Sequence, residues 1–398
     1  MKFSDLSSPL FFENPYPLYH NLRAGAPFVP LGPNAYVTGR YDIVESLLLD
    51  RRMGKDYLQS VRVRYGDDAL QLPIFQGIAR MFIMLNPPVH TRLRSLMMKA
   101  FNARQVEFMR DVAYSTANRL IDAFADNGAA DLVRQYAFPL PVEIICRLLD
   151  VPVDHATTLG EATRQFVRVL EPAPLPADAL NEANLAYETL TSYFVDVVEA
   201  RRERLGSDLI SMLLSVEEGG EVLSADEVVS NVVLLFVAGH ETTSNMIGNA
   251  LIALHRHPEQ LARLKNDPSQ LSKAVAECSR YDSSVQIVVR TAIEDIEVDG
   301  FVLPRNASVF FALGAAHRDP SKFDKPDELD FDREQSRLLS FGAGIHYCLG
   351  YRLAILELEA ALGTLLKRLP DLKLGNLEEL RWARRLTVRG VEALEATW

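Results

Sequence analysis

The sequence predicts a mainly α-helical protein with some β-structure, on the basis of three observations. Residues 105–215 show one helical pattern after another, separated only by short breaks. A long apolar run begins after Ser224 and continues to Pro258, which predicts a single buried helix. Short stretches such as 35–38 and 285–289 are rich in β-branched and aromatic residues, which favour strands.

Length and composition indicate a globular chain. The 398 residues are 48% hydrophobic and 24% charged, and no repeat or flexible linker interrupts them, so we expect one domain over residues 1–398. The formal net charge of −11 argues against a nucleic-acid surface. Three cysteines are too few for a disulfide framework and indicate a reducing compartment. With no signal peptide, membrane anchor or long apolar window, the expected location is the cytoplasm.

The first part of the chain combines short elements with an irregular apolar segment. Residues 14–22 form an amphipathic stretch, residues 35–38 read as a strand and residues 41–49 as a helix. Residues 55–85 mix aromatic and aliphatic side chains with glycine and proline and lack a clean period. Such a segment indicates either a packed surface loop or the wall of a binding site.

A helix is predicted to open after Asn86-Pro87-Pro88 and to carry two basic side chains on one face. His90 and Arg94 are four residues apart, which places them on the same side of the helix. Two donors in this arrangement can hold a carboxylate. A solvated basic face is the alternative interpretation.

The long apolar run contains a polar interruption in its middle. Ser224-Ala-Asp-Glu227 is a capping box, and the roughly thirty residues that follow would make a helix about 50 Å long. Residues 238–243 read Ala-Gly-His-Glu-Thr-Thr, and such groups are costly inside a buried helix. They indicate either a functional site or a satisfied polar break in a core helix.

Three smaller patterns punctuate the rest of the chain. Residues 171–177 form a Pro-rich loop that resists helix formation. Glu277 and Arg280 are three apart in a predicted helix and can form an ion pair. Residues 296–304 read as a hairpin around an Asp-Gly turn.

The strongest chemical signal is the loop Phe341-Gly-Ala-Gly-Ile-His-Tyr-Cys-Leu-Gly350. Its single cysteine, Cys348, lies in a Gly-rich turn directly before an amphipathic helix, whose N-terminal end favours a thiolate. One cysteine is insufficient for a four-thiolate zinc site or an iron–sulfur cluster. A single thiolate suits the axial ligand of a haem, whereas a buried structural cysteine is the alternative.

This ten-residue pattern resembles the haem-binding signature of the cytochromes P-450. The resemblance covers about residues 10–398 through five motifs in the expected order and points to the soluble bacterial type. It implies a mainly α cytochrome P-450 fold with small β-sheets, a haem b cofactor and Cys348 as the ligand of its iron. The haem contacts that it implies are His90, Arg94, Ala238, Gly239, Arg290, Phe341, Gly342, His346, Cys348 and Gly350.

The same resemblance implies roles for other segments. Glu241 and Thr242 correspond to the acid–alcohol pair of the oxygen-activation motif, and they are the expected catalytic residues. Residues 55–85 and 171–177 correspond to the region that covers the substrate and to a lid. An ion-pair network behind the cysteine loop is implied for Glu277, Arg280 and Arg333. Residues 387–390 resemble a turn at the pocket floor, and Gln286 and Val289 are candidates to face the pocket.

The chain departs from the family pattern at several positions. Ser284 replaces a usual proline and Leu329 a usual aromatic residue, which affects local packing. Leu338 replaces a histidine that commonly binds a haem propionate. The propionates would then depend on His90, Arg94, Arg290 and His346.

The implied activity is haem-thiolate monooxygenation. It inserts one atom of O2 into a C–H or C=C bond of a mid-sized hydrophobic substrate, such as a natural product of secondary metabolism. Two electrons are required, which implies a ferredoxin and a ferredoxin reductase that uses NAD(P)H. The alternatives are a peroxide-driven or non-hydroxylating cytochrome P-450 and a haem-bearing recruitment module without turnover, and the pair Glu241–Thr242 argues against both.

A basic patch is expected near the segment that carries His90. Arg92, Lys99 and Arg104 cluster there, and Arg352 follows the cysteine loop. On an acidic chain this patch predicts an acidic redox partner and salt-sensitive association. An ordinary solvated helix face is the alternative.

Overall fold

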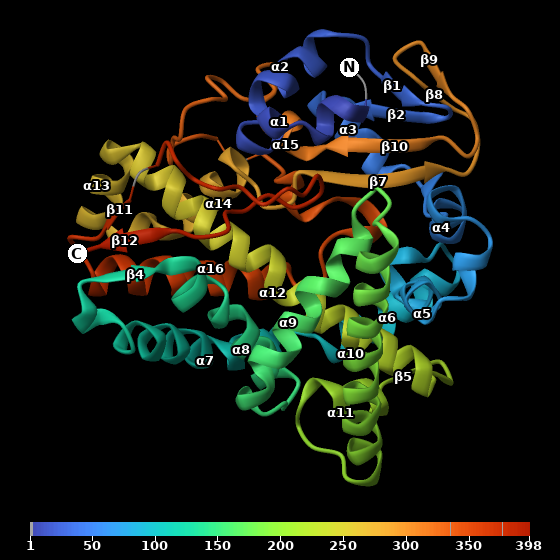
Figure 1. The fold of residues 1–398 in the computed structure, drawn as a ribbon, viewed down its shortest axis with the longest axis horizontal. Helices are drawn as coiled ribbons and strands as arrows, with labels where there is room; N and C mark the ends of the chain where they lie inside the picture. The colour runs from blue at the N-terminus through green and yellow to red at the C-terminus, as the bar shows by residue number, and fades with distance from the viewer. Residues whose placement is uncertain (1–2, 335, 376) are drawn as a thin grey trace. The chain divides into compact units, whose positions relative to one another are not determined.

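Helices dominate the computed structural model, which describes residues 3–334, 336–375 and 377–398 (Figure 1). The helices are α1 (Pro9–Glu13), α2 (Tyr16–Ala24), α3 (Tyr41–Leu49), α4 (Tyr57–Tyr65), α5 (Pro73–Arg80), α6 (Val89–Ala100), α7 (Ala103–Asp122), α8 (Pro139–Leu148), α9 (Ala156–Phe166), α10 (Ala177–Glu203), α11 (Leu209–Ser215), α12 (Ala225–Arg256), α13 (Pro258–Asn266), α14 (Leu271–Tyr281), α15 (Leu313–Ala316) and α16 (Tyr351–Arg368). The strands are β1 (Val29–Gly32), β2 (Ala35–Thr38), β3 (Met53–Gly54), β4 (Ala129–Asp131), β5 (Glu217–Glu218), β6 (Glu221–Val222), β7 (Ile287–Ala292), β8 (Ile296–Val298), β9 (Phe301–Leu303), β10 (Ser308–Ala312), β11 (Lys373–Leu374) and β12 (Glu395–Thr397). The predicted fold class, mainly α with small sheets, is confirmed.

The chain divides into two compact units, each described by itself below. Unit 1 comprises residues 1–54, 113–140 and 242–398, and unit 2 comprises residues 55–112 and 141–241. Helices α7, α8 and α12 each contribute residues to both units. The expectation of one domain over residues 1–398 stays a prediction.

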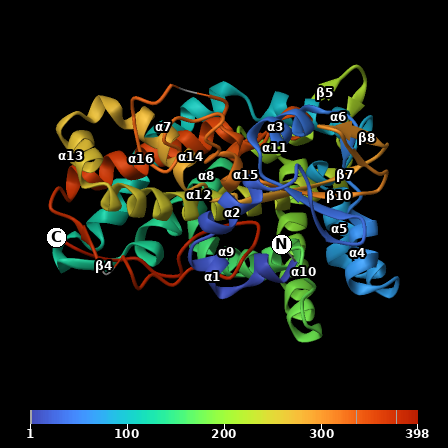
Figure 2. The same ribbon diagram turned by 90° about the horizontal axis from the view of Figure 1, so that it is seen from above.

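The main sheet of unit 1 has the strand order β1-β2-β10-β7-β3. Strand β10 pairs in parallel with β2 and antiparallel with β7, so that Val309 lies opposite Arg290. Alternate residues of β10 enter two apolar clusters: Phe311 packs with residues of α3, and Phe310 with residues of α2. Figure 2 shows α15 beside α2 at this sheet. The strand is therefore buried on both faces, as its apolar sequence requires.

Several predicted elements are confirmed at their predicted bounds. Strand β2 covers residues 35–38, helix α3 covers residues 41–49, and β8 and β9 form the hairpin within residues 296–304. Its turn residues, Asp299 and Gly300, have φ values of 52° and 73°. Two successive positive φ angles match the right-handed twist of the paired strands, which explains the Asp-Gly sequence.

Helix α12 confirms the long apolar run. Glu227 N–H donates to Ser224 Oγ at 3.3 Å, and Ser224 N–H donates to Glu227 Oε2 at 2.9 Å. This reciprocal capping box starts the helix, which continues without a break to Arg256. The Ala-Gly-His-Glu-Thr-Thr interruption therefore lies within regular helix.

Residues 55–85 contain two short helices, α4 and α5, where the sequence shows no clean period. Asp56 caps α4 by accepting the N–H of Gln59 at 3.4 Å, and Gly66 ends it at φ 86°. Pro73 occupies the first turn of α5. Each helix is about two turns long, which is too short for periodicity to reveal.

None of the helices that the structure describes combines the length and hydrophobicity needed to cross a membrane.

Candidate functional site

The cysteine loop of unit 1 is shaped by its glycines. Gly342 and Gly344 have φ values of 71° and 65°. A Cβ on Gly344 would lie 2.4 Å from the carbonyl oxygen of Leu48, so no other residue fits there. Cys348 N–H donates to the carbonyl of Phe341 at 2.8 Å, which closes the loop before α16 begins. The Cys348 side chain is neither fully buried nor fully exposed.

Two contacts hold the start of this loop in place. The N–H of Leu339 donates to Nε2 of His317 at 2.8 Å, and Ser340 Oγ donates to the carbonyl of Ser279 at 2.9 Å. His317 is fully buried, and burial together with the nearby Arg280 charge lowers its pKa to about 3. The imidazole therefore stays neutral and keeps an acceptor nitrogen at physiological pH. No local pattern in the sequence indicates this role for His317.

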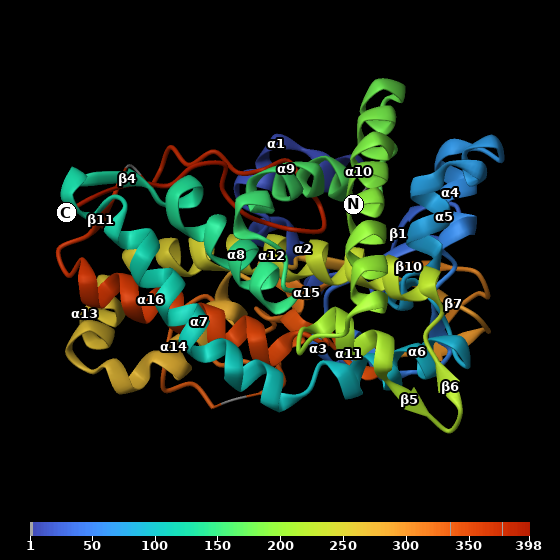
Figure 3. The same ribbon diagram turned by 90° about the horizontal axis from the view of Figure 1, so that it is seen from below.

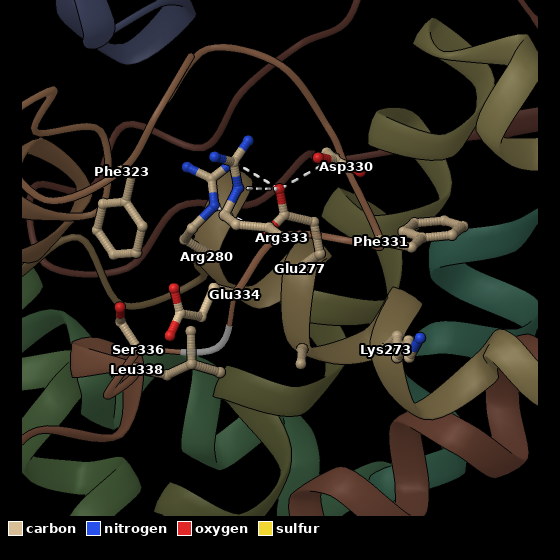
Figure 4. A pocket seen from close by; sticks show the side chains of 11 residues that line it. Lys273, Glu277, Arg280, Phe323, Asp330, Phe331, Arg333, Glu334, Ser336 and Leu338 are labelled. Carbon is tan, nitrogen blue, oxygen red and sulfur yellow. Dashed lines mark hydrogen bonds and ion pairs between the residues drawn. The ribbon is translucent and has the colours of Figure 1, made fainter.

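The predicted ion-pair network of unit 1 is confirmed (Figure 4). Glu277 binds Arg280 with two contacts of 2.7 and 2.8 Å, and Arg333 Nε donates to Glu277 Oε1 at 3.0 Å. Arg280 also donates to the carbonyls of His317, Pro326 and Glu328. The cavity beside these residues has a volume of about 30 Å³, room for about one water. The network therefore organises backbone rather than binding a ligand.

Arg290 is a buried cation whose surroundings leave its charge uncompensated. Arg290 is 7% exposed. Among the described residues, its Nη1 donates a hydrogen bond to the carbonyl of Val289 at 3.0 Å. No carboxylate of the described residues forms an ion pair with it, and burial lowers its pKa to about 10. A buried guanidinium in this state is suited to a bound anion such as a propionate.

Unit 2 carries the other predicted anion-binding side chains on α6. His90 is 1% exposed, and its ring lies 6.1 Å from that of Phe82. Arg94, one turn later, is half-buried. The burial of His90 contradicts the alternative of a solvated basic face at this position.

The polar turn of α12 opens on one side of an otherwise buried helix. Ala238 is exposed, Thr242 and Asn245 are half-buried, and their spacing of four and three residues places them on one face. Glu241, by contrast, is only 7% exposed. A Cβ on Gly239 would lie 3.3 Å from Ile145 Cδ1, so close packing within unit 2 gives a structural reason for this glycine.

Glu357 is a residue that sequence reasoning missed. It lies on α16, is 1% exposed, and its pKa is raised well above the usual range by burial, an effect partly offset by a hydrogen bond from Thr243. Burial therefore favours the protonated carboxyl, and its hydrogen bond with Thr243 ties α16 to the turn of α12 that follows Thr242. Glu357 lies one turn from both Leu353 and Ala361, on the apolar face of α16. A carboxylate at this position of the apolar pattern is the signal that could have identified it from the sequence.

The turn at residues 387–390 packs on α12 within unit 1. A Cβ on Gly390 would lie 1.8 Å from Asn245 Oδ1, and Thr387 O accepts the N–H of Gln286 at 2.9 Å. Gln286, a candidate to face the pocket, is 2% exposed and lies against Gly314. Its side chain is therefore part of the interior of unit 1, because it packs where Gly314 has no side chain.

The structure distributes the predicted site residues between the two units. Unit 1 contains Thr242, Arg290 and the loop with Phe341, Gly342, His346, Cys348 and Gly350; unit 2 contains His90, Arg94, Ala238, Gly239 and Glu241. The described residues contain no group of three or more His, Cys, Asp or Glu side chains that could bind a metal ion. A loop cysteine, together with a buried cation that pairs with no carboxylate of the described residues, suits a haem with acidic side chains.

Comparisons with known proteins agree with these features. The family model described as Cytochrome P-450 matches residues 52–370. The chain is 58% identical to "Putative cytochrome P-450 133B2" of Xylella fastidiosa over 100% of this chain and 99% of that protein. It is 35% identical to 6-deoxyerythronolide B hydroxylase of Saccharopolyspora erythraea, over 98% and 97% of the two chains. Among solved structures, P-450BioI in complex with acyl carrier protein ligated to hexadec-9Z-enoic acid superposes with a TM-score of 0.91 at 32% identity, covering 98% of each chain.

Proposed function

Because the chain belongs to the cytochrome P-450 family of monooxygenases, we propose that it inserts one oxygen atom from O2 into a mid-sized hydrophobic natural product. The reaction is a hydroxylation or an epoxidation. The observation that carries the proposal is the Phe341–Gly350 loop, which presents the half-exposed Cys348 directly before α16.

In this proposal, Cys348 is the sole protein ligand of a haem b. Bound haem supplies the oxygen chemistry, and a thiolate ligand favours cleavage of the O–O bond. Arg290, His90, Arg94 and His346 hold its propionates. The buried state of Arg290 supports this assignment, because a desolvated charged group gains most from a partner of opposite charge.

Proton delivery is assigned to Glu241 and Thr242. They are consecutive in α12, and Glu241 is buried whereas Thr242 is half-buried. A carboxylic acid next to an alcohol can resupply the proton that the alcohol donates. Ala238 and Gly239 place little side-chain bulk on the same turn.

Electrons are proposed to come from NAD(P)H through a ferredoxin reductase and a ferredoxin, in the cytoplasm. The substrate is proposed to be a polyketide, a terpenoid or an acyl chain. Relatives named as a 6-deoxyerythronolide B hydroxylase and a biotin biosynthesis cytochrome P-450 support this range. The complex of P-450BioI with an acylated carrier protein supports an acyl substrate that is bound to a carrier.

The thiolate assignment is tested by spectroscopy of the reduced protein with carbon monoxide. A thiolate complex has a strongly red-shifted Soret band, which the wild type is expected to show and Cys348→His to lose. Retention of the band in Cys348→Ser would overturn the assignment.

The monooxygenase assignment is tested by product formation with NAD(P)H and surrogate ferredoxin partners. Steady, O2-dependent turnover is expected. Turnover with peroxide alone, or none with any ligand that shifts the Soret band, would favour the peroxide-driven enzyme or the recruitment module. A Soret-shift screen with free fatty acids, acylated carrier protein, macrolides and terpenoids ranks the substrate classes directly.

A further inference from the structure

The cationic face of α6 is covered by an acidic segment of the same chain. Residues Glu217–Val222, here called the acidic strap, form the hairpin of β5 and β6 with Gly219 and Gly220 at its tip. The strap and α6 both belong to unit 2, and Figure 3 shows the strap beside α6. The sequence predicts a basic patch on this segment and, from it, an acidic partner.

The strap pairs with the cations of that patch. Lys99 Nζ lies 3.3 Å from Glu218 Oε1 and 3.5 Å from the carbonyl of Glu217, and Ser95 Oγ also donates to Glu218. Arg92 Nη1 donates to the carbonyl of Val222 at 3.1 Å, and its Nε lies 3.8 Å from Glu221. The strap therefore follows the face on which residues 92, 95 and 99 recur at helical spacing.

The local charge balance is the opposite of the one that the sequence predicts. Arg92 also forms an ion pair with Glu227 at the start of α12. Arg92 and Lys99 thus face three carboxylates, those of Glu218, Glu221 and Glu227, while the Glu217 carboxylate accepts the N–H of Gly220 within the strap. With the strap in place, this face does not attract an acidic protein.

The strap is weakly held, so it can be displaced. Its residues 217–222 are all exposed, whereas Leu213 and Leu223 on either side are buried. Its contacts with α6 are polar, and ion pairs at the surface are weak and screened by salt. Paired strands of two residues are also marginal without further packing.

We propose that the acidic strap is an intramolecular competitor that occupies the cationic face of α6 until an acidic electron-transfer protein displaces it. The proposal rests on the proposed function, because it takes an acidic ferredoxin as the electron donor. Displacement exchanges one set of carboxylates for another on Arg92, Ser95 and Lys99. The strap therefore lowers the affinity for any acidic protein that does not match this face.

The test compares Glu217→Gln/Glu218→Gln/Glu221→Gln with Asp154→Asn/Glu161→Gln/Glu199→Gln, a control with the same change in net charge at exposed positions of unit 2. The probe is an acidic [2Fe–2S] ferredoxin titrated into the haem-loaded proteins. At low ionic strength the strap variant is expected to bind about three- to tenfold more tightly than the control. At about 0.5 M salt the difference should vanish, because screening removes these interactions.

Amide hydrogen exchange gives a second readout that requires no turnover. Adding either salt or the ferredoxin to the wild type is expected to speed exchange at residues 217–222, while the ferredoxin slows exchange in α6. If both variants bind the ferredoxin equally, or if exchange in the strap is unchanged or slower, the strap is not a competitor. The proposal that a ferredoxin supplies the electrons would still stand. Absence of ferredoxin binding and reduction in every protein would overturn both proposals.

Discussion

Two buried residues of unit 1 have opposite effects on how stability depends on pH. Burial lowers the pKa of His317, so its imidazole binds a proton more readily in the unfolded chain than in the folded protein. Stability therefore falls as pH drops below 6.5. Burial raises the pKa of Glu357, so stability falls as pH rises above 4.5. His317 holds the loop of Cys348 through Leu339, and Glu357 joins α12 to α16 through Thr243.

We predict that Glu357→Gln stabilises the protein at high pH. The amide keeps the shape and the bond with Thr243, and it removes the penalty for neutralising a carboxylate that is ionised in the unfolded chain. The midpoints of denaturant unfolding of the variant and the wild type should converge toward pH 4.5 and separate up to pH 8. The exposed Glu379→Gln is the control. A wild-type protein at least as stable at pH 8 would contradict the protonated state of Glu357.

We predict that Thr242→Ala uncouples electron consumption from product formation. The variant should bind haem and substrate and oxidise NAD(P)H, but yield less product and release peroxide, because the hydroxyl proposed to donate a proton is absent. Glu241→Gln should instead slow turnover by up to about 10²–10⁴, the range for general acid–base groups. Product per NAD(P)H is the measurement, and Thr242→Ser should keep more coupling than alanine. Full coupling in Thr242→Ala would weaken the monooxygenase proposal.

At the scale of elements, α4 holds the Pro-rich loop of unit 2. Arg64 Nη1 donates to the carbonyls of Val169 and Glu171 at 3.2 and 2.8 Å, and the hydroxyl of Tyr65 accepts the N–H of Leu175 at 3.0 Å. Prolines at 172, 174 and 176 contribute no N–H, so this loop cannot bond to itself as a helix does. Side chains from α4 supply the missing partners.

We predict that Tyr65→Phe loosens this loop without disturbing its surroundings. The ring contact with Phe75, 5.2 Å between centroids, is retained, and only the acceptor for Leu175 N–H is lost. Amide exchange at Leu175 should become about 5- to 10-fold faster, as the loss of one hydrogen bond suggests. Tyr193→Phe, which removes a hydroxyl paired with His155 elsewhere in unit 2, should leave Leu175 unchanged. Equal rates in the two variants would show that Tyr65 does not hold the loop.

At the scale of the whole molecule, Arg389 joins distant parts of the chain within unit 1. Its guanidinium donates to the carbonyls of Phe12 and Glu13 at 2.6 and 3.0 Å and pairs with Asp282 at 3.1 Å. The guanidinium also stacks on Trp382, 3.4 Å from the ring centroid. Arg389 thus links α1, the end of α14 and the C-terminal segment.

We predict that Arg389→Ala destabilises the protein by about 3–5 kcal/mol, because it leaves Asp282 buried without its cation. The exposed Arg384→Ala should change the unfolding free energy by less than about 0.5 kcal/mol. Thermal and denaturant unfolding measure both. A loss below about 1 kcal/mol would show that Tyr16, which donates to Asp282 at 2.7 Å, suffices for the carboxylate.

The sequence by itself determined the features that rest on local physics. The capping box of Ser224 and Glu227, the Asp299-Gly300 hairpin and the ion pair of Glu277 with Arg280 all involve residues within a few positions of each other. Such contacts follow from chain geometry alone. The ten residues of the cysteine loop resemble the signature of the family, and the match of the family model to residues 52–370 confirms that resemblance.

Only the tertiary structure decided which charges are paired and which polar groups are buried. The cations of α6 meet acids that follow them by more than a hundred residues, so the sequence did not reveal that Arg92 and Lys99 are already paired within the chain. His317 and Glu357 gain their shifted pKa values from burial among residues remote in sequence. Desolvation and long-range pairing depend on how the chain packs, and no local pattern encodes them.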